Sequence, residues 1–175
     1  MVDVSLTPAE LVRLVLPDGL PAGVGAPTLV GDALTADVDA REIPGLPAAA
    51  RLAARAAGTV TVRVVVADVV AGRLTLGVTA TARGLPAHRL VGLVRGTVED
   101  AVRARLVERG VAGDAVRLEA GGAGSTGDAL RVVVSTAAFL AAAPLPAHLR
   151  GLRVTALRLA DGRLHVTVAA PPSPR

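Results

Sequence analysis

The sequence predicts one α+β domain, and two patterns carry that prediction. Alternation of apolar and polar side chains with a period of two is typical of strands that bury one face. It occurs in residues 34–41, 59–66, 74–83 and 164–168. Residues 86–109 instead repeat apolar side chains with a helical period, which predicts one amphipathic helix of about 24 residues, roughly 36 Å long. We expect the domain to cover residues 1–170 and residues 171–175 to form a disordered tail.

Capping and turn signals define further elements. Thr7-Pro8-Ala9-Glu10 is a capping box with proline at the first helical position, so a short N-terminal helix is expected there. An alanine-rich helix is expected at residues 48–57, ending at Gly58. Asp161-Gly162 predicts a tight turn between the last two strands, and a change of phase near Ala156 predicts a β-bulge. Additional strands are expected at residues 116–120 and 130–134.

The composition excludes several classes of function. Hydrophobic residues make up 51% of the chain, yet it has one Phe and no Trp or Tyr, so it lacks the aromatic side chains on which single-stranded nucleic acids stack. All 19 basic residues are arginines and they are scattered, which argues against a DNA-binding face. Cysteine is absent, and the N-terminus lacks the pattern of a signal peptide. We therefore expect a cytoplasmic protein without disulfides or thiolate metal sites.

Motifs that would indicate an enzyme are weak. Residues 122–127 satisfy G-x-G-x-x-G, but strand-like residues follow them where a dinucleotide site needs a helix. His88, His148 and His165 are not at metal-ligand spacing, and His165 is expected on the solvent face of the last strand. Asp37 and Asp39 share a strand face, which we interpret as solvated. No catalytic residue, metal or cofactor is predicted, although a histidine beside a carboxylate in a deep pocket would reverse this.

Four valines fall where the alternation predicts a second strand face or a strand end. They are Val65, Val69, Val70 and Val133. A sheet that is apolar on both faces must cover both of them. The second cover would be a helix, a partner chain or a ligand, unless the strand is simply internal.

The C-terminal hairpin resembles a known family. Residues 149–154 read L-x-G-L-x-V and residues 161–166 read D-G-x-L-x-V. This pair of strands resembles the C-terminal end of bacterial LmeA-like phospholipid-binding proteins, which are similar to the tubular lipid-binding (TULIP) group. The resemblance implies a curved antiparallel sheet wrapped around one long amphipathic helix. It also implies an apolar groove between them that holds acyl chains, and no catalytic residues.

We therefore expect non-catalytic binding of an apolar or lipid-like ligand between the long helix and the sheet. Small aliphatic side chains suit such a lining because acyl chains need burial rather than specific contacts. The candidate lining residues are Val62, Val64, Val66, Leu76, Val78, Leu90, Val94 and Val98. Arg89 and Arg95 are candidates to meet an anionic head group. The alternative is a protein-protein interaction or homodimer without a small ligand. Peripheral membrane contact fits the first hypothesis, and no nucleic-acid partner is expected.

Overall fold

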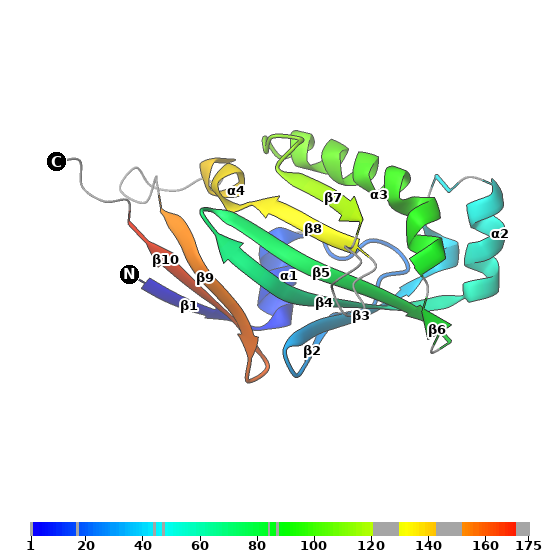
Figure 1. The fold of residues 1–175 in the computed structure, drawn as a ribbon, viewed down its shortest axis with the longest axis horizontal. Coiled ribbons are helices and arrows are strands. Elements are labelled where there is room, and N and C mark those ends of the chain that lie inside the picture. The colour runs from blue at the N-terminus through cyan, green and yellow to red at the C-terminus, as the bar shows by residue number, and fades with distance from the viewer. Residues whose placement is uncertain are drawn as a thin grey trace.

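Two antiparallel sheets dominate the structure, a computed structural model (Figure 1). It describes residues 2–16, 18–43, 45–46, 48–83, 85–86, 88–120, 130–142 and 152–170. Among the described residues, more lie in strands than in helices. The Gly-rich loop at residues 122–127, His148 and the predicted tail at residues 171–175 lie outside the described residues.

The larger sheet has seven strands. Six of them follow the order β2-β3-β4-β5-β8-β7, and the short β6 pairs with β5. The strands are β2 (Thr28–Val30), β3 (Ala33–Asp39), β4 (Thr59–Val70), β5 (Arg73–Ala82), β6 (Leu85–Pro86), β7 (Val116–Ala120) and β8 (Leu130–Ser135). The alternating segments predicted from sequence therefore form strands, and β4 and β5 pair with each other as a long antiparallel hairpin.

The smaller sheet contains β1 (Val2–Leu6), β10 (Arg163–Ala169) and β9 (Arg153–Ala160), in that order. No sequence pattern predicted β1, which pairs with β10 from Val2↔Val168 to Leu6↔Leu164. The predicted bulge in β9 is confirmed, because the register shifts between Ala156↔Thr167 and Val154↔Val168. The Asp161-Gly162 turn is also confirmed, with φ values of 53° and 72°.

Local signals also set the helices. The predicted helices are present as α1 (Pro8–Val15), α2 (Ala48–Ala57) and α3 (His88–Glu108), and α4 (Thr136–Ala142) follows β8 directly. Gly58 ends α2 with a φ of 68°, the left-handed conformation that glycine adopts without strain. A single 3-10 turn, η1 (Ala40–Glu42), joins β3 to the segment before α2.

The buried side chains of the described residues form two small apolar clusters. One joins η1 to α2 through Ala40, Leu46, Ala50 and Ala54. The other joins the end of α3 to the start of β7 through Leu106, Val111 and Ala115, with Phe139 of α4 packed against it. Alanine makes up much of this interior, so the clusters bury less area per residue than leucine or phenylalanine would.

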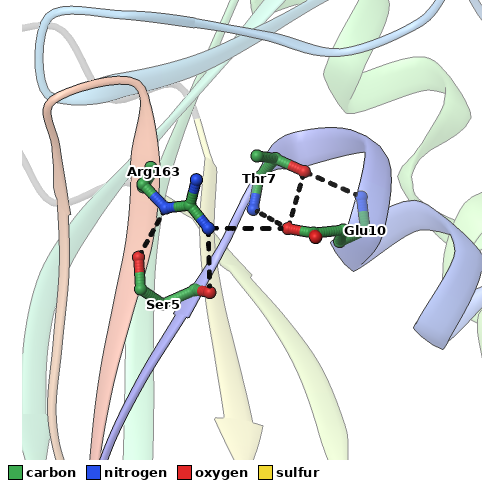
Figure 2. Close-up of polar contacts among 4 residues, drawn as sticks. All are labelled: Ser5, Thr7, Glu10 and Arg163. Carbon is green, nitrogen blue, oxygen red and sulfur yellow. Dashed lines mark hydrogen bonds and ion pairs between the residues drawn. The ribbon is translucent and has the colours of Figure 1, made fainter.

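The capping box also ties α1 to the smaller sheet, as Figure 2 shows. The Thr7 backbone N–H and hydroxyl donate to Glu10 Oε2 at 2.7 and 2.8 Å, and the Glu10 N–H donates to Thr7 Oγ1 at 3.2 Å. Arg163 of β10 donates to Ser5 Oγ at 2.7 Å and lies 3.8 Å from Glu10 Oε2. The Thr7 hydrogen bonds, followed by the charge of Arg163, lower the pKa of Glu10 below its ordinary value.

The expected wrapping of one sheet around one long helix is wrong. The described residues form two antiparallel sheets and four α-helices, and neither sheet is wrapped around α3. Figure 1 shows α3 alongside β7, with α2 near one end of it. The larger sheet extends past β5 because β8 and β7 add to it, so α3 lies at the margin of this sheet.

Candidate functional site

One face of the larger sheet is aliphatic across six strands, and we call it the apolar face. Leu29 of β2 pairs with Leu34 of β3, and Leu34 pairs with Val64 of β4, so these residues lie on the same side of the sheet. The pair Val64↔Val78 extends this side to β5. The pairs Leu76↔Val132 and Leu118↔Val132 carry it through β8 to β7. Paired residues in adjacent strands point to the same side of a sheet. The apolar face therefore consists of Val, Leu and Ala along all these strands.

The five predicted lining residues on β4 and β5 lie together on the apolar face. Val64 pairs with Val78, Val66 pairs with Leu76, and Val62 pairs with Ala80. All five are half-buried, whereas Ala80, Leu118 and Leu130 of the same face are buried. Val116, Val132 and Val134 of the same face are half-buried as well, so the cover of the apolar face is incomplete across the sheet.

The structure describes the side chains of only some of the predicted ligand-binding residues on α3. Val98 is half-buried, while the side chains of Arg89, Leu90 and Val94 lie outside the described residues. The Arg95 guanidinium donates to the carbonyl oxygen of Leu118 on β7. Because β7 is the last strand of its sheet, this bond satisfies a backbone acceptor at an open edge. A role of Arg95 toward an anionic head group stays a prediction.

Gly96, the next residue of α3, leaves space beside the helix. A Cβ built at this position meets nothing within 4 Å, so the glycine is not required by close packing of another backbone. We expect Gly96→Ala to raise the free energy of unfolding by about 0.5–1 kcal/mol, because alanine has the higher helix propensity. Urea unfolding followed by far-UV circular dichroism measures this, and a loss of stability would contradict it.

The pairing register of β4 and β5 shows that two of the four valines predicted on a second strand face, Val69 and Val70, need no second cover. The pairing of β4 with β5 shifts between Val66↔Leu76 and Asp68↔Thr75, so Ala67 is an extra residue. This bulge returns Val69 to the apolar face, opposite Leu74. Val70 lies at the hairpin end and is exposed, so it needs no cover.

The other two valines do lie on the opposite face. Val65 pairs with Ala33 and Gly77, and Val133 pairs with Thr75 and Arg117. This opposite face, which we call the polar face, also carries threonines and charged residues. The two half-buried valines interrupt it without making it apolar.

Asp37 and Asp39 lie on the polar face and have separate partners. Asp37 accepts a hydrogen bond from the Thr61 hydroxyl at 2.7 Å, and Asp39 accepts from the Arg41 side chain at 2.8 and 2.5 Å. The Arg41 side chain and backbone N–H lower the pKa of Asp39 to about 2. A carboxyl that stays ionised at neutral pH cannot act there as a general acid.

The histidines and helices of the described residues bear on metal binding and on membrane insertion. His165 was expected on a solvent face, but it is half-buried and its Nε2 is shielded, without a hydrogen-bond partner among the described residues. The side chain of His88 is not described. No group of three or more His, Asp or Glu side chains that could hold a metal occurs in the described part. None of the described helices is long and apolar enough to cross a bilayer.

A shallow depression, which no sequence pattern predicted, lies on the polar face. It measures about 260 Å³ and is formed where α4, β5, β7 and β8 meet. Its lining residues are Arg73, Asp114, Ala115, Arg117, Glu119, Val133, Ser135 and Ala138. Strand alternation places Arg73 and Arg117 on polar positions, but only the pairing of β5, β8 and β7 brings them together.

Comparison of the chain with protein-family models, curated proteins and solved structures finds no match. The candidate site is therefore interpreted from its own residues.

Proposed function

We propose that the apolar face of the larger sheet binds an acyl chain or a similar aliphatic ligand without catalysis. The observation that carries this proposal is the composition and burial of that face. It is aliphatic over six strands, yet its central residues Val62, Val64, Val66, Leu76 and Val78 stay half-buried. A face of this kind gains free energy from any further apolar cover.

The chemistry of the face favours a polymethylene chain over other apolar ligands. Its side chains are Val, Leu and Ala, which offer no hydrogen-bonding atom and no aromatic surface. Burial of about ten methylene groups would contribute on the order of 8 kcal/mol before the entropic cost of association is subtracted. The net affinity would then be in the micromolar range or weaker.

Uptake of a fluorescent C16 fatty acid tests the proposal. The chain has no Trp or Tyr, so the probe signal is free of intrinsic fluorescence. We expect saturable uptake by the wild type and a loss of at least tenfold in affinity for Val78→Asp, because a charge would enter the apolar face. Thr79→Asp is the matched control, since Thr79 is equally half-buried but lies on the polar face opposite Arg63.

A second variant separates loss of binding from loss of folding. Val78→Phe keeps the face apolar and fills space, so it should reduce fatty-acid uptake while the far-UV spectrum stays that of the wild type. Absence of saturable uptake by the wild type would overturn the proposal. If size exclusion then showed a dimer, a second copy of the chain would be the cover, as in the alternative hypothesis.

A further inference from the structure

The depression on the polar face has a floor and two cationic sides. Val133 and Ser135 of β8 form the floor. Arg73 of β5 pairs with Ser135 on one side, and Arg117 of β7 pairs with Val133 on the other. Backbones two strands apart are separated by about 9.6 Å, so two arginine side chains can reach a small group between them.

Backbone hydrogen bonds hold this frame together. The Ser135 N–H donates to the Ala115 carbonyl at 2.7 Å, and the Thr136 N–H and hydroxyl donate to the Gly72 carbonyl at 2.9 and 2.8 Å. Gly72 directly precedes Arg73, so the bonds from Thr136 fix the backbone that carries the arginine. The two arginines therefore start from positions that are set before any ligand arrives.

The cations around the depression are incompletely neutralised. Arg117 has one ion pair, 3.7 Å from Asp114, and both side chains are well exposed, which makes the pair weak. Arg73 makes no hydrogen bond or ion pair within the described residues. Arg131, on the same polar face, keeps its Nε atom buried without a partner in that part of the chain. Glu119 also lines the depression and is paired in register with Arg131, which lies outside the lining, so the lining itself carries two carboxylates and two guanidinium groups.

Ser135 adds a neutral donor to the floor. Its Oγ accepts from the Ala138 N–H at 3.4 Å, which leaves the hydroxyl hydrogen available. Donors that approach from two sides and from below match a tetrahedral oxyanion better than a planar carboxylate. Guanidinium groups bind phosphate through paired N–H donors.

We propose that this depression binds the phosphate group of a small soluble ligand through Arg73, Arg117 and the Ser135 hydroxyl. The ligand is either inorganic phosphate or a small phosphomonoester. The site lies on the face opposite to the proposed acyl-binding surface and does not depend on it.

Isothermal titration calorimetry of the full chain with inorganic phosphate and with glycerol 3-phosphate tests the proposal, using sodium chloride of equal ionic strength as the reference. We expect saturable binding of one or both phosphates, and the tighter one identifies the source. Arg73→Gln should weaken binding about tenfold. Arg63→Gln, on the same face but paired with Asp32, is the matched control and should leave binding within twofold.

A variant that binds phosphate more tightly than the wild type is a useful further test, because misfolding would not increase affinity. Asp114→Asn removes a competing carboxylate and should tighten phosphate binding severalfold. Absence of phosphate binding by the wild type, or equal weakening by Arg73→Gln and Arg63→Gln, would overturn the proposal. Fatty-acid uptake should be unchanged in Arg73→Gln, so failure of this site and failure of the acyl site are distinguishable.

Discussion

Gly23→Ala is expected to lower the free energy of unfolding by about 3 kcal/mol. Gly23 has a φ of 78°, and a Cβ there would lie 2.5 Å from Glu42 Cβ and 3.2 Å from the Asp39 carbonyl oxygen. Neither atom can move without its backbone, because one is a Cβ and the other a carbonyl oxygen. The left-handed conformation contributes about 1 kcal/mol of the loss and the close contact about 2 kcal/mol.

Gly19→Ala is the matched control for this prediction. Gly19 has a similar φ of 88°, but a Cβ there meets nothing within 4 Å. It should therefore show only the conformational cost of about 1 kcal/mol. Urea unfolding followed by far-UV circular dichroism measures both variants. Equal losses would show that the contact with Glu42 does not constrain the chain.

The position of Gly23 matters for the sheet as well as for stability. Its carbonyl accepts from the Asp39 N–H at 2.7 Å, and the Gly25 N–H donates to the Asp37 carbonyl at 2.7 Å. Residues 23–25 therefore continue along the edge of β3 beyond β2. This cover protects backbone groups that would otherwise be open to pairing with another chain.

Leu106→Ala is expected to lower the free energy of unfolding by about 3 kcal/mol. Leu106 is 8% exposed and belongs to the cluster that joins α3 to β7 and α4. Shortening the side chain removes apolar burial and leaves a cavity, because packing from three elements cannot collapse into it fully. The expected readout is a lower urea midpoint with an unchanged slope.

Val107→Ala tests whether this loss is specific to the cluster. Val107 is the next residue of α3 and is 60% exposed. Its replacement should change stability by less than about 0.5 kcal/mol, since little burial is lost and alanine favours the helix. A loss at position 107 as large as that at position 106 would mean that α3 packs differently from the described structure.

The local elements of this protein follow from short stretches of sequence. The Thr7–Glu10 capping box, the helix ending at Gly58 and the Asp161-Gly162 turn each depend on neighbouring residues, and each was predicted. The bulge in β9 could also be predicted, because polar and apolar side chains change phase around it. The bulge at Ala67 could not, because residues 64–67 are all apolar and carry no phase.

The candidate sites were predictable only in part, because local patterns show which side chains share a strand face but not which strands become neighbours. Alternation placed Val62, Val64, Val66, Leu76 and Val78 on one face, and the β4–β5 register confirms that they share it. No local pattern brings Arg73 and Arg117 to either side of β8, because this depends on the order of β5, β8 and β7.

Sequence alone determined the longer strands, the three helices α1, α2 and α3, and the aliphatic face of β4 and β5. The tertiary structure decided that β1 pairs with β10 across most of the chain length, and that β8 and β7 extend the larger sheet so that it does not enclose α3. Turns and caps are set by bonds between residues a few positions apart. Strand pairing is set by the total burial and hydrogen bonding of segments far apart in the chain, which no short window contains.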